Sequence, residues 1–321
     1  MNSLSAFKYF FLFFQHIFNP PIDSLKGINM VDQEGFSVRP YAKYQAWGVK
    51  MKSNNDALVL LPNVKYQGGV SLSYKGFTLS LAAGIKTPYE QTFGSTNEKA
   101  LRLNYFGKRL NASIFHETYK SFFYTKPSEI DVSWAKGQRR PINEDLKMLQ
   151  AGINLYLYFS PDYSMKANMH QSQKMLRSAG STFAGLSYLK STYEDPFGFI
   201  PQIKSNNFDT LNLLNKIATD SYLISFGYSY TWVHHQFFVY TNLAAGSGIQ
   251  KQSISQFEIK KSNPAIPAKF SFFTSGGFNG KKFILSLNVF LENHYSFLNN
   301  SNLQNFFYSF RFNVGYRFGM Q

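Results

Sequence analysis

The last segment of the chain alternates between bulky and small or polar side chains, and this alternation limits the fold more than any other feature. From residue 306 to 318 every even position carries Phe, Tyr or Val, whereas the odd positions after Phe307 carry Ser, Arg, Asn or Gly. Successive side chains of a β-strand point to opposite faces, so the pattern predicts a strand with one aromatic and one polar face. At about 3.3 Å per residue, such a strand is long enough to cross the apolar band of a bilayer at a tilt.

The same alternation recurs at residues 77–85, 149–159, 222–232 and 283–292, where small and polar residues dominate the opposite face. The chain has 34 Phe and 21 Tyr, which suit the apolar band and the headgroup level of a membrane, respectively. Its mean hydropathy is −0.25, as expected when apolar and polar faces alternate. The chain contains no run of about 18 apolar residues that would predict a membrane-spanning helix. The expected fold is therefore an all-β, antiparallel transmembrane β-barrel.

Turn signals divide this expected barrel into hairpins. Tight turns are indicated at Lys75-Gly76, Gly107-Lys108, 160–162, His234-His235 and Asn279-Gly280, and Asn-Gly is a strong two-residue hairpin signal. Longer links lie between them, at about 48–65, 87–97, 125–146, 193–219, 248–266 and 297–302. Short turns that alternate with long loops are typical of bacterial barrels, in which the short turns are periplasmic. Both chain ends are expected on that side.

This division predicts about twelve strands, with ten to fourteen still open. Residues 162–190 are too long for one strand at about 10 residues per crossing, and they form a bulged strand, an inward excursion or two strands. The link 193–219 is expected to form a short helix in a surface loop, and 125–146 a solvated loop. The expected strands are roughly 35–47, 66–75, 76–86, 98–106, 108–123, 147–160, 162–190, 220–233, 235–247, 267–278, 281–296 and 303–319.

The first 25 residues differ from the rest. The apolar run 7–14 contains Lys8 and is followed by Asn19-Pro20-Pro21, which breaks a helix. Residues 1–25 are interpreted as a poor export signal, with an N-terminal segment packed in or on the barrel as the alternative. The barrel domain is expected to cover 35–321. Cysteine is absent, which excludes disulfide scaffolds, thiolate metal sites and Cys nucleophiles.

Several short stretches carry a family resemblance. They are Phe36–Tyr41, Leu61–Asn63, Ser73–Phe77, Tyr119–Tyr124 and Arg177–Ser181. With these stretches the chain resembles the uncharacterised bacterial outer-membrane family known as domain of unknown function 4421, from about residue 35 to the C-terminus. The resemblance implies a barrel and no particular chemistry. Many outer-membrane barrels end on an aromatic residue, whereas here Phe318 is followed by three more residues.

The chain is strongly basic, with 33 Lys+Arg against 18 Asp+Glu and a formal net charge of +15. No helix-turn-helix, zinc-finger or RNA-binding signature accompanies this charge, so nucleic acid is not an expected partner. Basic rims suit an anionic lipopolysaccharide leaflet, and a basic lumen suits anions. The expected location is the bacterial outer membrane. The expected partners are its lipid and lipopolysaccharide, the barrel assembly machinery and a small anionic solute.

If the aromatic faces point to lipid, eight charged side chains point into the lumen. They are Arg39, Lys43, Arg102, Glu117, Lys166, Glu292, Arg311 and Arg317. Two interpretations are open. The charges can form a network of ion pairs and hydrogen bonds that fills the barrel, or a basic interior that favours anions.

No residue stands out as catalytic. His116 with Glu117, and His170 with Ser172, are the pairs that general acid–base or nucleophilic chemistry could use, but their spacing singles out no nucleophile. His234-His235 lies in an expected turn and makes a poor metal pair. Neither a metal site nor a cofactor is expected. The first hypothesis is a non-enzymatic barrel, either a narrow pore or a structural scaffold. The alternatives are a lipid-modifying barrel enzyme and a soluble β protein that binds an apolar ligand.

Overall fold

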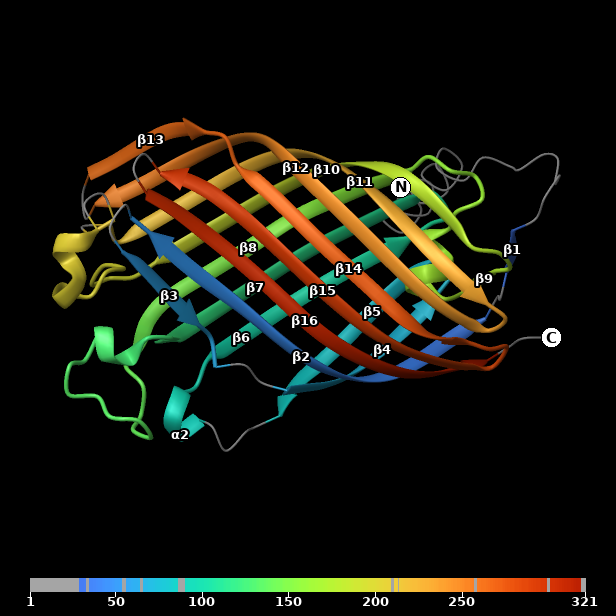
Figure 1. The fold of residues 1–321 in the computed structure, drawn as a ribbon, viewed down its shortest axis with the longest axis horizontal. Coiled ribbons are helices and arrows are strands. Elements are labelled where there is room, and N and C mark those ends of the chain that lie inside the picture. Colours follow the sequence, from blue (N-terminus) through green and yellow to red (C-terminus); the bar gives the residue numbers. More distant parts are fainter. Residues whose placement is uncertain are drawn as a thin grey trace, which may run out of the picture.

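The computed structural model describes residues 29–32, 35–53, 56–63, 66–85, 90–208, 211–212, 214–256, 259–298 and 301–318. Twelve antiparallel strands form a closed ring, in which each strand pairs with its neighbours along the chain and the first, β2, pairs with the last, β16 (Figure 1). The proposed export signal at 1–25 lies outside the described residues. The ring strands are β2 (Phe36–Lys52), β4 (Tyr66–Tyr74), β5 (Phe77–Ile85), β6 (Asn97–Phe106), β7 (Leu110–Tyr124), β8 (Ile142–Tyr158), β10 (Ala179–Glu194), β11 (Lys216–His234), β12 (Phe237–Gln256), β14 (Ala268–Asn279), β15 (Phe283–Leu298) and β16 (Ser301–Phe318).

Shorter elements lie outside this twelve-strand ring. β3 (Ala57–Leu61) pairs with β2 and β7, and β13 (Ile259–Ala265) pairs with β12. β1 (Met30–Asp32) and β9 (Gln173–Met175) form a separate two-stranded sheet. The helical pieces are α2 (Glu90–Phe93), the 3₁₀ helices η1 (Pro127–Glu129) and η3 (Gln202–Asn207), and the π-helix η2 (Lys166–His170). Among the described residues, no helix is long and apolar enough to span a membrane.

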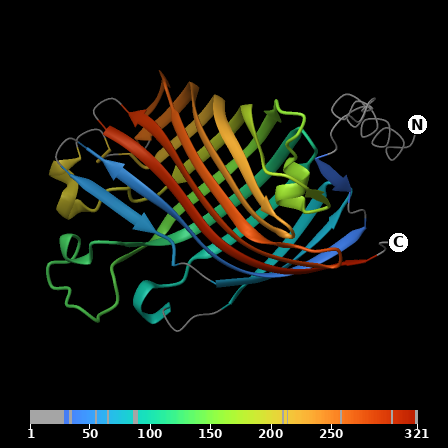
Figure 2. The same ribbon diagram turned by 45° about the vertical axis from the view of Figure 1, so that its right-hand side comes forward.

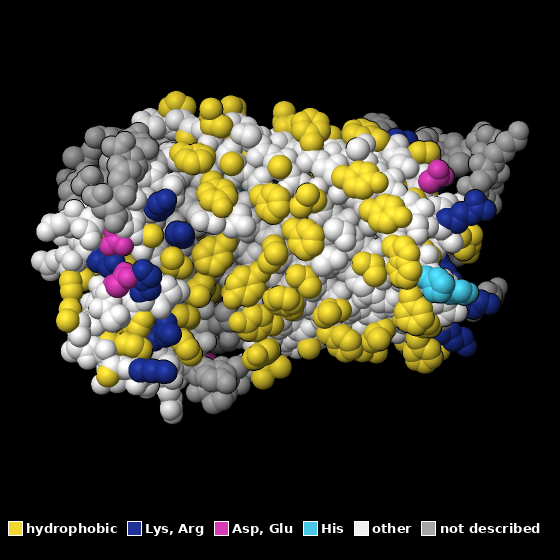
Figure 3. Space-filling model, viewed as in Figure 1, with side chains coloured by type: hydrophobic (Ala, Val, Ile, Leu, Met, Phe, Trp, Pro, Cys, Tyr) yellow, Lys and Arg dark blue, Asp and Glu magenta, His cyan; other side chains and the backbone are white. Residues whose placement is uncertain are grey.

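The predicted alternation of side chains is confirmed. On β11 the outward residues Ile224, Phe226 and Tyr228 are exposed, whereas the alternate residues Ser225 and Ser229 are buried. Figure 3 shows the result on one face of the molecule, where hydrophobic side chains spread across the middle and charged side chains gather towards the two ends. An apolar belt between polar rims is the surface of a transmembrane barrel. The soluble alternative required the aromatic stripes to converge on a core, and it is therefore wrong.

The predicted strand count of twelve is confirmed, but the strand boundaries need correction. At the end where the long links lie, the strands continue past the apolar band: β12 runs to Gln256, although a link was expected from 248. The segment 162–190 proves to be an inward excursion followed by a strand. Residues 160–178, called the inward segment below, contain η2 and β9, and the ring resumes at β10.

The inward segment closes the end of the barrel where the short turns lie. Figure 2 shows it coiled within that end, beside β1 and the final residues of β16. Asn29 fixes it by donating from Nδ2 to the Asp162 carbonyl at 2.9 Å and by accepting from the Arg177 N–H at 2.8 Å. Its apolar side chains join inward residues of the ring in one buried cluster, which contains Tyr158, Tyr163, Met165, Ala167, Met175, Phe183, Phe238, Tyr240 and Ala244.

The opposite end is closed by residues from the link after β10. This link was expected to form a short helix in a surface loop. The short helix is present as η3, but Leu211 and Leu214 are buried, so the expectation of a surface loop is wrong. The link's residues Phe199, Ile200, Phe208, Leu211 and Leu214, called the loop cap below, pack onto inward side chains of the ring. Burial of each such apolar side chain contributes about 1.5–3 kcal/mol to the stability of the folded protein. The ring residues of this cluster include Trp47, Val49, Met51, Tyr119, Leu146, Met148, Tyr193 and Leu303.

A charged residue on the outward face tests whether that face contacts lipid. Phe226 is 66% exposed in the middle of β11, and Ile249 is 70% exposed on β12 nearer the long links. Phe226→Arg is expected to destabilise the protein in lipid vesicles by about 2–4 kcal/mol, and Ile249→Arg by less, because the cost falls from the bilayer centre to the interface. Equilibrium unfolding followed by heat-modifiable gel migration measures both. Equal tolerance of the two changes would argue against a membrane-facing surface.

Candidate functional site

Between the two closed ends lies a cavity of about 270 Å³, called the chamber. Its walls are inward side chains of the ring, mostly Ser, Thr, Asn and aromatic residues, together with Met165, Asn168, Met169 and Gln171 of the inward segment. Six of the eight charged residues expected in the lumen line it, namely Arg39, Lys43, Arg102, Glu117, Glu292 and Arg311. Alternation along each strand brings them together, because residues two apart share a face.

The other two expected lumen charges lie elsewhere. Arg317 is buried at the short-turn end, where its guanidinium donates to the Lys281 carbonyl at 2.9 Å and to the carbonyls of Gly280 and Gln171. It therefore ties the last strand to the inward segment. Lys166 is the first residue of η2, and its backbone N–H donates to the Gly107 carbonyl at 3.1 Å. Its side chain is half-buried and does not line the chamber.

Two ion pairs hold part of the interior charge. Arg102 Nη2 lies 3.0 Å from Glu117 Oε1, and Lys269 Nζ lies 3.1 Å from Glu292 Oε2. The sequence interpretation missed Lys269, and also Glu98, which accepts a hydrogen bond from Gln67 Nε2 at 3.0 Å. Both could have been recognised from the alternation along their strands. Lys269 is two residues from the inward Ser271, and Glu98 is four residues from the inward Arg102, so each faces the same side as its neighbour.

Four interior cations, Arg39, Lys43, Arg311 and Arg317, have no carboxylate within ion-pair distance in the described part of the chain. Arg311 Nε donates to Asn313 Oδ1 at 2.7 Å, and its guanidinium stacks 3.6 Å above the Tyr41 ring. These partners are neutral, so they orient the guanidinium without cancelling its charge.

Arg39 also has neutral partners, whereas Lys43 has no direct partner among the described residues. Arg39 Nη1 donates to the Met169 carbonyl and to Gln171 Oε1, both at 3.4 Å, and its Nε is buried without a hydrogen-bond partner among the described residues. Within the same described set, Lys43 Nζ has neither a hydrogen bond nor an ion pair, although it lines the chamber. The interior therefore carries more cationic side chains than carboxylates, and the resulting positive electrostatic potential favours a negatively charged ligand.

The candidate catalytic pairs are not brought together. His116 is exposed on the outer face of β7, whereas Glu117 is buried inside and pairs with Arg102. Adjacent strand residues face opposite sides, so the two cannot act on one substrate. The side chain of His170 lies outside the described residues, and Ser172 Oγ is buried without a hydrogen-bond partner in the described chain. The rings of His234 and His235 are 4.4 Å apart at the β11–β12 turn. No group of three His, Cys, Asp or Glu side chains suited to a metal occurs among the described residues.

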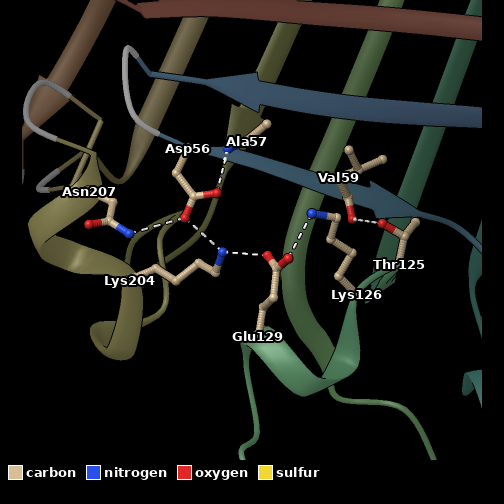
Figure 4. A network of polar contacts seen from close by, with 8 residues as sticks. All are labelled: Asp56, Ala57, Val59, Thr125, Lys126, Glu129, Lys204 and Asn207. Carbon is tan, nitrogen blue, oxygen red and sulfur yellow. Dashed lines mark hydrogen bonds and ion pairs between the residues drawn. The ribbon is translucent and has the colours of Figure 1, made fainter.

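A polar latch joins three connections at the long-link end (Figure 4). Lys204 Nζ on η3 lies 2.7 Å from Asp56 Oδ2 and 2.6 Å from Glu129 Oε2. Lys126 Nζ lies 2.7 Å from Glu129 Oε1, and Asn207 Nδ2 donates to Asp56 Oδ2 at 3.2 Å. The latch therefore holds the link that carries the loop cap against the segments before β3 and after β7.

The electrostatics of the latch make its strength depend on pH. The hydrogen bond from Lys204 holds the pKa of the Asp56 carboxyl below its usual value. Hydrogen bonds from Lys126 and Lys204 do the same for the pKa of Glu129. Burial works against the charge on Lys204, but its bonds to the two carboxylates outweigh burial and raise its pKa. Carboxyl groups with a depressed pKa stabilise the folded form at pH values above their ordinary pKa, which is about 4, and this contribution is lost progressively as the pH falls from there through the lowered pKa of the folded form.

Acidification is therefore expected to release the latch. A nitroxide attached to Ile203→Cys, in a chain that has no other cysteine, should be immobilised at pH 7 and mobile at pH 3, as read from its electron paramagnetic resonance spectrum. In the double variant Ile203→Cys/Lys204→Met the label should be mobile at both pH values. A spectrum that changes with pH equally in both proteins would show that the latch is not the titrating unit.

Several solved structures of outer-membrane proteins are similar to this chain. The outer membrane protease OmpT of Escherichia coli has a TM-score of 0.41 at 7% sequence identity, covering 92% of this chain and 100% of that chain. The COG4313 outer membrane channel of Pseudomonas putida F1 has a TM-score of 0.35 at 11% identity, covering 92% and 100%. The P. putida toluene transporter TodX has a TM-score of 0.30 at 7% identity, covering 89% and 91%.

No curated protein sequence matches this chain. The resemblance noted from its short motifs is nevertheless confirmed at the level of the family. The family model described as Domain of unknown function (DUF4421) matches residues 29–318, which include the whole ring, both closed ends and the charged chamber. The protein belongs to the DUF4421 family.

Proposed function

We propose that this protein is a non-enzymatic barrel of the bacterial outer membrane that binds a small anion in its chamber. The observation that carries the proposal is the set of cations without a carboxylate partner, of which Arg39, Lys43 and Arg311 line the chamber. The location is supported by the closed ring and its apolar belt, because closed barrels leave no unpaired edge in lipid. The short-turn end, closed by the inward segment, then faces the periplasm.

The chemistry of the chamber suits an oxyanion. Guanidinium groups bind carboxylate and phosphate oxygens through charge-assisted hydrogen bonds, and an ammonium group adds a point charge. Arg39 and Arg311 are held in place by neutral partners, so their positions are set before a ligand arrives. A volume of about 270 Å³ accommodates an anion of a few heavy atoms with some of its water.

A permanently open axial pore is disfavoured by the two closed ends. The loop cap fills one end with buried aromatic and aliphatic side chains, and the inward segment fills the other. Flow along the axis requires one of them to move. The lipid-modifying enzyme gains no support either, because His116 and Glu117 lie on opposite faces of β7.

The binding proposal is tested by removing two chamber cations. Lys43→Met/Arg311→Met is expected to weaken binding of inorganic phosphate at least tenfold, since a hydrogen bond to a charged group contributes about 1.5–3 kcal/mol and 1.4 kcal/mol is tenfold in affinity. Isothermal titration in detergent or nanodiscs gives the dissociation constants. Lys75→Met/Lys190→Met removes the same charge from exposed positions and is expected to bind as the unmodified protein does. Unchanged affinity in the chamber variant would refute the proposal.

The closed state predicts a specific conductance phenotype. The Asp195 N–H donates to the Asn215 carbonyl at 2.9 Å, so the chain can be joined there by a short Gly-Ser turn in place of residues 197–213. The full chain is expected to show no steady current in planar bilayers. The shortened chain, which lacks most of the loop cap, should show steps that favour chloride over potassium in a salt gradient. Steady steps in the full chain, or cation selectivity in the shortened one, would contradict this prediction.

A further inference from the structure

The ring has a weak seam between β5 and β6. Only three residue pairs join these strands, Phe77 with Tyr105, Thr78 with Asn104, and Leu79 with Leu103. On their other edges, β4 pairs with all nine residues of β5, and β7 pairs with all ten of β6. Residues 80–85 of β5 and 97–102 of β6 therefore have one edge unpaired, towards the end with the long links.

An unpaired edge in hydrocarbon is costly unless it lines a hydrated space. A second cavity, of about 500 Å³, lies here, and both edges line it: Ser80, Ala82 and Gly84 from β5, and Asn97, Glu98 and Ala100 from β6. Ala82, Gly84 and Ala100 have the parity of lumen residues, yet they are exposed. The cavity therefore lies along the unpaired stretch of both strands on their lumen side, and it is called the slot below.

The outward side chains beside this unpaired stretch are apolar. Leu81 on β5 is 60% exposed and Leu101 on β6 is 62% exposed, and both point outward. The rings of Tyr44 and Tyr66 lie 5.3 Å apart at the end of β4 that pairs with Ile85, and clustered Tyr rings are typical of the membrane interface. The unpaired stretch thus lies in the half of the apolar belt nearest the long links.

The inner end of the slot is the charged chamber. Lys43, Arg102, Glu117 and Arg311 line both cavities. Lys43 and Arg311 are also two of the cations that lack a carboxylate partner. An occupant of the slot would therefore place one end among these cations and the other between Leu81 and Leu101, where only an apolar chain is stable.

We propose that the slot is a lateral binding port for a single-chain anionic amphiphile, whose head group lies beside Lys43 and Arg311 while its tail passes between β5 and β6 into the membrane. The head-group contact rests on the proposed anion-binding function, whereas the lateral path rests on the broken pairing. One chain fits better than two because the opening is confined to six residues on each edge.

The experiment uses dodecyl phosphate with a photoreactive diazirine in its tail, added to the full chain in lipid nanodiscs. Irradiation and peptide mass spectrometry should place most of the label on 80–85 and 97–102 rather than on the outward face of 222–232. Excess dodecyl phosphate should compete, and excess dodecanol, which has the tail without the charge, should not. Even labelling of all outward faces would overturn the port, since a tail dissolved in the bilayer meets them all.

Matched variants separate the port from the anion site. Ala82→Phe fills the slot, and it is expected to cut the labelling at least fivefold while leaving the affinity for inorganic phosphate unchanged. Ala83→Phe places the same ring on the outward side of β5 and should label as the unmodified protein does. Ala100→Phe fills the slot from the opposite edge and serves if Ala82→Phe does not fold, as judged by heat-modifiable migration.

The two proposals fail in different ways. Normal labelling of a folded slot-filling variant refutes the port and leaves anion binding intact. Unchanged phosphate affinity in Lys43→Met/Arg311→Met refutes the anion site, whatever the label does. If Lys43→Met/Arg311→Met leaves the labelling unchanged while Ala82→Phe clearly reduces it, the port binds a neutral amphiphile. That result would overturn the proposed head-group contact.

Discussion

The need to pair every backbone N–H and C=O group inside a membrane governs this structure. A ring in which β2 meets β16 has no free edge outside the short stretch between β5 and β6, so the chain can expose Phe, Leu and Ile on its outer belt. The same requirement makes the seam between β5 and β6 meaningful. Eleven of the junctions around the ring are paired over most of their length, and the one that is not lies beside a cavity lined by both of its strands.

Closing the ring from strands alone leaves a space that must be filled or hydrated, and this protein does both. Apolar side chains fill it at the two ends, where the loop cap and the inward segment pack. In between, arginines are oriented by neutral partners such as Asn313 and Gln171. Burying charge without full neutralisation is unfavourable for stability, and this cost is the physical reason for proposing an anionic ligand in the chamber.

The wall of the barrel could be predicted from the sequence, whereas its contents could not. Alternation is a local property of each strand, so Phe226 and Arg311 reveal their faces without any knowledge of their neighbours. The loop cap depends on contacts between Leu211, Leu214 and strands distant in sequence, and a single link carries no periodic signal for that. The inward segment was ambiguous for the same reason. The weakness of the β5–β6 seam was hidden because Leu81 and Leu101 both lie in regular strand patterns, and pairing is decided between strands.

Arg317 links the last strand of the ring to the segment that closes the short-turn end. It sits near the end of the final ring strand, and its guanidinium reaches the carbonyls of Gln171 in the inward segment and of Gly280 in the preceding turn. A chain without this strand lacks a guanidinium that fastens the inward segment at the short-turn end. Closure of the ring and fixation of the segment that fills its end therefore depend on the same last hairpin, because β16 supplies both the pairing with β2 and Arg317.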